Sequence, residues 1–216
     1  WADYQATNLT LLAGAGPLFD LGSHSVDLAR YLVGDISSVS ALTRTFIQER
    51  WLPGSGTATF MAGEHSSERG QVTVDDAALM MVEFENSALG SIEVTRFAGG
   101  RRNFNTFEIY GSKGSLSFNL ERMNELQYFS QDDPKDEQGF RNILVTNPTL
   151  PFVGAWWPVG HIIGYEHTFT HAVADFLLAL DKGEVIRPNF EDGVKEMEVL
   201  DAALRSARDG QKIIIG

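Results

Sequence analysis

The 216-residue sequence contains no cysteine, which excludes disulfide bonds and thiolate metal sites. It also has no run that approaches the roughly 18 to 20 apolar residues needed to cross a bilayer. The first residues, WADYQATNLTLLAGAG, include neither a methionine nor a basic segment followed by an apolar core. We therefore expect no signal peptide, a cytoplasmic location and further residues upstream of Trp1.

Basic residues are scarce, with 17 Lys and Arg against 29 Asp and Glu, for a net charge of −12. A field of that sign argues against nucleic acid and against an anionic membrane as partners. Apolar residues make up 43% of the chain and charged residues 21%, which is ordinary for a folded globular protein. The length is sufficient to bury a substantial core.

Hydrophobic periodicity predicts strands in the middle of the chain and helices at both ends. In DDAALMMVEF, Ala78, Met80, Val82 and Phe84 share one face, and the other face is also apolar, so we expect a central strand. Further strands are expected within 36–51, 91–97 and 106–120, and helices over 23–32, 164–180 and 191–208. We expect a long excursion or poorly ordered hairpin over 52–71 and a loop over 131–138. The pattern predicts an α+β fold with helices on one face of the sheet, as a single domain over residues 1–216.

Glycine is abundant, but no glycine-rich stretch matches a dinucleotide fingerprint. GAGPLF has Phe19 where the third glycine belongs, and neither GSGTAT nor GSKGSL opens an amphipathic helix after a strand. We therefore predict no nucleotide-phosphate site within this chain.

His167 and His171 have the i, i+4 spacing of a helical metal site. The zinc-protease motif needs Glu directly after the first His, whereas Glu166 precedes it, and no third ligand is evident. We predict no metal site and favour a solvated or subunit-facing pair.

Two adjacent tryptophans, Trp156 and Trp157, precede His161 and Tyr165. Aromatic faces beside polar groups can form a platform for a carbohydrate, because sugar C–H faces pack on rings. Tryptophans also plug cores and interfaces. Composition leaves both interpretations open.

Asp20 and His24 flank Gly22 at the start of the first predicted helix. One interpretation is helix capping by Asp20 or Ser23. The other is chemistry, because the helix dipole disfavours an imidazolium in the first turn and so keeps a histidine neutral, as a general base requires. A carboxylate four residues earlier could orient the ring or bind a substrate hydroxyl.

The segment GPLFDLGSHSVDLARYLVGD resembles the D-x-G-x-H segment that opens the C-terminal domain of Gfo/Idh/MocA oxidoreductases. The resemblance continues, in the same order, through four more segments that span nearly the whole chain: VTVDDAALMMVEFENSALGSIEVTRFA, FEIYGSKGSLSFNLERMNELQ, WWPVGHIIGYEHTFTHAVADFL and NFEDGVKEMEVLDAALRSA.

This resemblance implies a large open, mainly antiparallel sheet that forms the subunit interface of a homodimer or tetramer. It also implies an NAD- or NADP-dependent enzyme that oxidises a secondary hydroxyl of a sugar or polyol to a ketone. The cofactor and a catalytic lysine would come from an N-terminal Rossmann domain, since the E-K-P and G-x-G-x-x-G motifs are absent here. We therefore expect this chain to be inactive alone.

In this interpretation His24 and Asp20 are the catalytic pair. The expected substrate contacts are Trp156, Trp157, His161 and Tyr165, followed by Arg96 and Arg102 near strand ends. Two alternatives remain, a non-catalytic assembly module on the same scaffold and a reductase of a non-sugar substrate.

Overall fold

The computed structural model describes residues 16–53 and 65–216. Its chain forms two compact units, one from residues up to 99 together with 188–216, and one from residues 100–187. The expected single domain over residues 1–216 stays a prediction.

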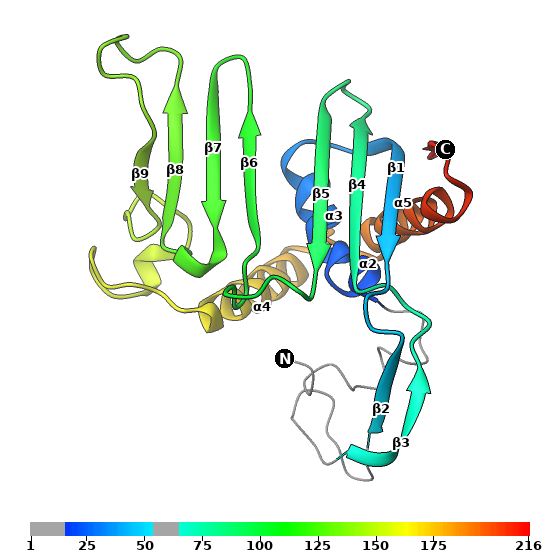
Figure 1. Ribbon diagram of the computed structural model, residues 1–216. Helices are drawn as coiled ribbons and strands as arrows, with labels where there is room; N and C mark the ends of the chain where they lie inside the picture. The colour runs from blue at the N-terminus through cyan, green and yellow to red at the C-terminus, as the bar shows by residue number, and fades with distance from the viewer. Residues whose placement is uncertain (1–15, 54–64) are drawn as a thin grey trace. The chain divides into compact units, whose positions relative to one another are not determined.

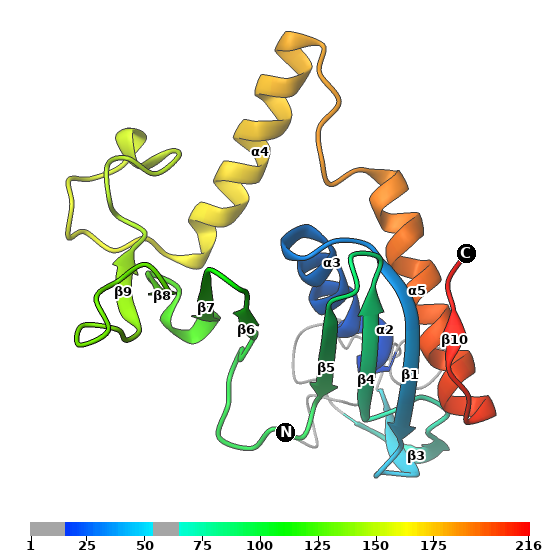
Figure 2. The same cartoon turned by 90° about the horizontal axis from the view of Figure 1, so that it is seen from above.

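The first unit contains a four-stranded antiparallel sheet in the order β10-β1-β4-β5. Helices α2, α3 and α5 cover one face of this sheet (Figures 1 and 2), as the sequence predicted. The elements of this layer are α2 (Pro17–Asp20), α3 (Gly22–Leu32), β1 (Ile36–Arg44), β4 (Ala77–Phe84), β5 (Leu89–Thr95), α5 (Phe190–Asp209) and β10 (Ile213–Ile214).

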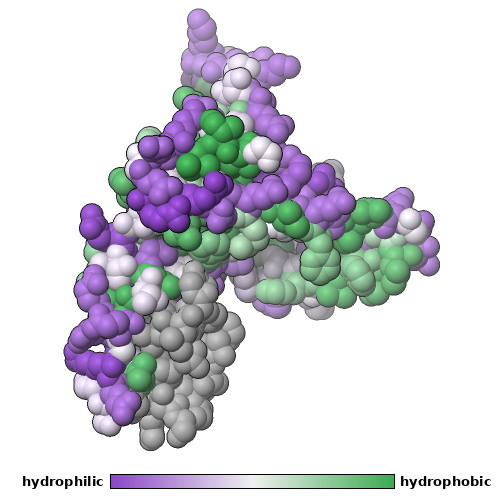
Figure 3. Space-filling model, turned by 90° about the vertical axis from the view of Figure 1, so that its right-hand side faces the viewer, coloured by the Kyte–Doolittle hydropathy of each residue, from purple (hydrophilic) through white to green (hydrophobic). Residues whose placement is uncertain are grey.

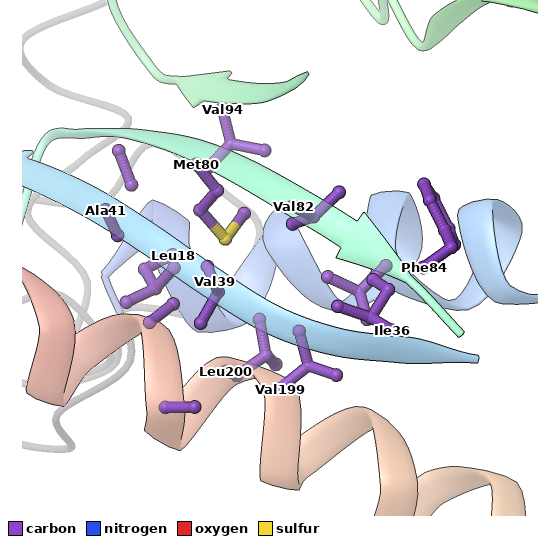
Figure 4. Packing of buried hydrophobic residues seen from close by; sticks show 14 residues of the cluster. Leu18, Ile36, Val39, Ala41, Met80, Val82, Phe84, Val94, Val199 and Leu200 are labelled. Carbon is purple, nitrogen blue, oxygen red and sulfur yellow. The ribbon is translucent and has the colours of Figure 1, made fainter. Parts of the chain in front are cut away.

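The core lies between this sheet and its helices. Ala78, Met80, Val82 and Phe84 are buried on the helix-covered face of β4, and β4 lies between β1 and β5, so the predicted central strand is confirmed. Figure 4 shows Leu200 of α5 among these core side chains.

A separate antiparallel hairpin pairs β2 (Glu49–Pro53) with β3 (His65–Gln71). It overlaps the stretch 52–71, for which we expected a long excursion or a hairpin, and residues 54–64 lie outside the described residues.

The second unit contains an antiparallel sheet in the order β6-β7-β8-β9, followed by helix α4. The predicted pair of strands joined through residues 111–114 is confirmed as β6 and β7, whereas β8 and β9 were not predicted. The elements are β6 (Thr106–Tyr110), β7 (Gly114–Asn119), η1 (Leu120–Arg122), β8 (Glu125–Ser130), β9 (Arg141–Leu144), η2 (Val153–Ala155) and α4 (Tyr165–Lys182).

Helices α4 and α5 both occupy the predicted positions, and α5 ends at Gly210 with the positive φ of 67° typical of a helix C-cap. The apolar stripe of α4 is solvent-exposed within this structure, with Phe169 59% and Leu180 66% accessible. In Figure 3, apolar side chains reach the surface at several separate places on the face shown. Among the described residues, no helix is both long and apolar enough to cross a membrane.

Candidate functional site

The corner between α2 and α3 carries the predicted pair. Asp20 is the last residue of α2, and His24 lies in the first turn of α3, with both side chains exposed. Ser23 is not the N-cap that the sequence predicted, because α3 already begins at Gly22. The Ser23 hydroxyl instead donates to the carbonyl of Asp20 at 3.2 Å.

Arg96, just after β5, donates a hydrogen bond from Nη2 to Oδ2 of Asp20. The Asp20 side chain is nevertheless 47% exposed, whereas that of Arg96 is 14% exposed. The carboxylate is therefore oriented by a cation and not used as a helix cap. It keeps exposed surface for a second hydrogen bond. The predicted contact of Arg96 with substrate stays a prediction, but the structure gives this residue a protein partner.

Asp75 holds the start of α2. Its Oδ2 accepts a hydrogen bond from the backbone N–H of Leu18 at 2.9 Å. A Cβ on Gly16 would lie only 2.1 Å from Oδ1 of Asp75, so this close approach requires glycine. Burial raises the pKa of the Asp75 carboxyl, although the Leu18 N–H acts in the opposite direction.

The neighbouring Asp76 is buried and fully engaged. Its Oδ2 accepts from the backbone N–H groups of Phe46 at 2.7 Å and Ile47 at 3.0 Å, and its Oδ1 accepts from Arg50 at 2.7 Å. The backbone carbonyl of Asp76 accepts from the N–H of Arg96 at 3.2 Å. The Asp75–Asp76 pair thus connects the chain segments that deliver Asp20 and Arg96.

The sequence reasoning missed Asp75 and Asp76 as supports of the site. A signal was present, since two consecutive carboxylates directly before a buried strand must find polar partners.

Helix α3 is fixed against α5 by Arg30. Its buried guanidinium donates to the backbone carbonyl of Asp192 at 3.0 Å and to Oδ1 of Asp35 at 2.8 Å. The hydrogen bond from Lys195, and then that from Arg30, lower the pKa of Asp35. These contacts hold the helix that presents His24.

Glu196 of α5 is the acidic neighbour of this helix. Its pKa is raised, first by burial and then by the charge of Asp27, while His24 and Arg30 act in the opposite direction. His24 therefore lies within the electrostatic reach of a carboxylate on α5.

The described glycine turns do not fit the phosphates of a dinucleotide. The Asp75 carboxylate already occupies the start of α2, and residues 111–114 form the hairpin between β6 and β7. The GSGTAT stretch lies outside the described residues. Within residues 16–53 and 65–216 there is also no group of three or more His, Asp or Glu that could hold a metal ion.

The second unit contains the predicted aromatic segment. Trp157 is 73% exposed, and its ring lies 6.3 Å from that of His161. Tyr165 is exposed and meets Phe169 edge to face at 5.3 Å. Trp156 is half-buried.

The structure contradicts the expectation of a solvated His167–His171 pair, whereas the subunit-facing alternative stays a prediction. Both histidines are half-buried, and their rings pack against Trp156.

Arg102 is exposed, and its backbone N–H donates to Glu121 at 2.7 Å. The predicted site residues therefore fall into two clusters. Asp20, His24 and Arg96 belong to the first unit, and the aromatic residues and Arg102 to the second.

Comparison with known proteins identifies the family of this chain. Residues 2–117 match the model of the GFO/IDH/MocA C-terminal domain. The chain belongs to the GFO/IDH/MocA family. The family resemblance proposed from the sequence and the α+β fold are therefore confirmed.

Three GFO/IDH/MocA relatives illustrate the similarity. Levoglucosan dehydrogenase of Pseudarthrobacter phenanthrenivorans is 42% identical over 200 residues, which cover 91% of this chain and 50% of that protein. The crystal structure of an oxidoreductase domain protein from Kribbella flavida is 44% identical with a TM-score of 0.84, covering 93% of this chain and 51% of the other. A levoglucosan dehydrogenase complex with NADH and levoglucosan is 35% identical with a TM-score of 0.87, covering 100% and 55%.

The chain thus spans about half the length of the relatives it matches. Levoglucosan dehydrogenase has also been solved with NADH and L-sorbose. These ligands are bound by the relatives.

Proposed function

We propose that this chain is the substrate domain of an NAD- or NADP-dependent dehydrogenase that oxidises a secondary hydroxyl of a sugar or polyol to a ketone, reversibly. The observation that carries the proposal is the exposed His24, four residues after an exposed Asp20 carboxylate that Arg96 orients. Relatives of similar fold bind NADH together with levoglucosan or L-sorbose.

His24 is the general base in this proposal. Its exposed ring lies in the first turn of α3, and an imidazole nitrogen can accept and return a proton. The ring takes the proton from the substrate hydroxyl and returns it in the reverse direction. Asp20 binds a substrate hydroxyl through its exposed carboxylate surface, while Arg96 keeps the group oriented.

The oxidation also requires a hydride acceptor, which we assign to a part of the protein outside this chain. The described glycine turns do not fit a dinucleotide, and the matched relatives are about twice as long as this chain. The functions assigned to the present residues are therefore proton transfer and substrate binding.

Trp157, His161 and Tyr165 form the proposed sugar wall. All three are exposed, and the Trp157 ring offers an apolar face to sugar C–H groups. Trp156 contributes only its ring surface, because its indole N–H already donates to His171. Arg102 is a further proposed contact to substrate hydroxyls.

The proposed oligomer uses the sheet face that the helices leave uncovered. On that face Leu42, Leu79 and Met81 are 68%, 51% and 69% exposed. Neighbouring exposed apolar side chains of this kind are typical of an interaction surface. We propose a homodimer or tetramer through this face, in a cytoplasmic enzyme.

The test is oxidation of levoglucosan, L-sorbose and a panel of polyols by the full-length protein with NAD⁺ or NADP⁺. His24→Ala is expected to lower kcat about 10²- to 10⁴-fold, as loss of a general base does, with little change in cofactor affinity. His65→Ala in β3 is the matched control and should retain activity. The 216-residue chain alone should be inactive.

Near-normal turnover by the His24 variant would exclude the general-base role. A full-length protein that binds no nicotinamide cofactor would instead favour the non-catalytic assembly module. Turnover of only non-sugar carbonyl compounds would favour the reductase alternative.

A further inference from the structure

The segment from Phe152 to Gly164 has no regular structure except η2, yet it is held to the start of α4 by two histidines. His171 receives a hydrogen bond from the indole Nε1–H of Trp156 to its Nε2, at 2.7 Å. An indole N–H can only donate, so His171 must be neutral at Nε2 and carry its proton on Nδ1. Phe152 stacks on the same imidazole at 4.5 Å between ring centroids.

His167 also accepts a hydrogen bond, but at Nδ1, whereas His171 accepts at Nε2. The backbone N–H of Gly164 donates to Nδ1 of His167 at 3.0 Å, so this ring is neutral with its proton on Nε2. Its ring also meets the Trp156 indole edge to face at 4.4 Å. The two histidines therefore hold both ends of residues 156–164 as acceptors.

Asn124 adds an uncharged anchor at Ile163, next to the Gly164 end of the segment. Its side-chain amide donates to the carbonyl of Ile163 at 2.8 Å and accepts from the N–H of Ile163 at 2.9 Å. This pairing does not change with pH. Between the anchors, Trp157 and Ile162 are 73% and 80% exposed.

The ring of His161, within residues 156–164, donates a hydrogen bond instead of accepting one. Its Nδ1 lies 2.8 Å from the carbonyl oxygen of Pro158, which can only accept, so Nδ1 donates. Protonation of His161 preserves this contact, whereas protonation of His167 or His171 at the accepting nitrogen removes one.

Among the residues that the structure describes, the charged group that lies against these two rings is the Glu166 carboxylate, 3.5 Å from Nδ1 of His167. This carboxylate also lies over Gly164, where a Cβ would approach Oε2 to 2.3 Å. A protonated His167 can therefore exchange the Gly164 N–H for an ion pair with Glu166. The groups against His171 are Trp156 and Phe152, which are uncharged.

We propose that His167 and His171, as neutral imidazoles, are positioning residues that hold the Trp157-bearing segment in its sugar-binding conformation, and that their protonation releases it. The inference rests on the proposed function, because it assumes that Trp157 contacts the sugar. Protonation of either accepting nitrogen removes a hydrogen bond to this segment, so substrate affinity should fall on acidification through these two residues.

The chain offers matched variants at each position. In His171→Gln and His167→Asn an amide oxygen can replace Nε2 and Nδ1 as the acceptor without titrating. In His171→Phe the aromatic stack on Phe152 is kept and the acceptor is lost. We expect His171→Phe in the full-length enzyme to raise KM for the sugar about fivefold to tenfold, as loss of one part-buried hydrogen-bond partner does, with kcat changed less than twofold. His171→Gln should restore the KM.

The pH profile separates positioning from a merely structural role. Wild-type KM should rise from pH 8 to pH 5.5, and the double variant His167→Asn/His171→Gln should flatten that rise. His65→Gln, the control, should keep the wild-type profile. An unchanged KM rise in the double variant would overturn the proposal.

A measurement without turnover keeps the inference distinct from the proposed function. Amide hydrogen exchange of residues 152–164, compared at one pH, should be faster in His171→Phe than in the wild type and the Gln variant, with α5 unchanged. Faster exchange in an enzyme that oxidises no sugar would refute the proposed function and, with it, the sugar-binding role but not the anchoring. Equal exchange in all three proteins would refute the anchoring itself.

Discussion

Two of the arginine–aspartate pairs in the first unit, Arg50–Asp76 and Arg96–Asp20, differ in exposure. The Arg50 and Asp76 side chains are 4% and 2% exposed, with 2.7 Å between the charged atoms, whereas those of Arg96 and Asp20 are 14% and 47% exposed. In the buried pair, Asp76 accepts two further backbone N–H groups. In the outer pair, Asp20 keeps exposed surface that a substrate hydroxyl can use.

The difference in exposure separates a pair that supports the fold from a pair that the proposed function assigns to substrate binding. A buried charge is tolerated only when it is paired and hydrogen-bonded, so Asp76 is committed to the fold. The two pairs are connected, because the Asp76 carbonyl also accepts from the Arg96 backbone. The buried pair thus fixes the backbone from which Arg96 reaches Asp20.

The largest expected effect comes from breaking the buried pair. Asp76→Ala leaves Arg50 and two backbone N–H groups without their acceptor, and removing one partner of a buried pair typically costs about 3–5 kcal/mol. Urea unfolding monitored by circular dichroism measures the loss. Asp20→Asn is the matched control and should cost at most about 1 kcal/mol, because exposed pairs contribute little. Equal losses in the two variants would contradict the comparison.

A smaller effect is expected from Arg96, and on activity more than on stability. Arg96→Met leaves Asp20 without the cation that orients it, and we expect kcat/KM of the full-length enzyme to fall about tenfold, which corresponds to about 1.4 kcal/mol. Arg44→Met, at the end of β1, controls for loss of a positive charge at this sheet. If both variants retained full activity, Arg96 would have no part in positioning Asp20.

Local patterns predicted the elements that have strong periodicity. The alternation of β4 and the lengths of α4 and α5 follow from their apolar spacing, and Asp20 and His24 were found because they flank one helix start. Strand β9 was missed because its four residues, Arg141–Leu144, are too short to show a period. Helix α2, also four residues, was missed for the same reason.

Long-range partners could not be predicted from the sequence. Asp75 binds the N–H of Leu18, 57 residues earlier, and Arg96 binds Asp20 across 76 residues. The roles of His167 and His171 depend on the path of a loop without period, which places Trp156 against them. In each case folding, not local spacing, creates the contact.

The smallest expected effect concerns Asp75, which supports α2 without a salt bridge of its own among the described contacts. Because burial raises its pKa in the folded state, ionisation of Asp75 opposes folding. The native state therefore bears this cost at pH values above the folded pKa and loses it as the pH falls. Asp75→Asn can keep an acceptor for Leu18 N–H and carries no charge, so it should stabilise the protein at pH 8 by less than about 1 kcal/mol. The gain should shrink toward pH 4, as followed by thermal unfolding at each pH. A variant whose advantage grew on acidification would show that the ionised carboxylate stabilises the α2 start more than its burial costs.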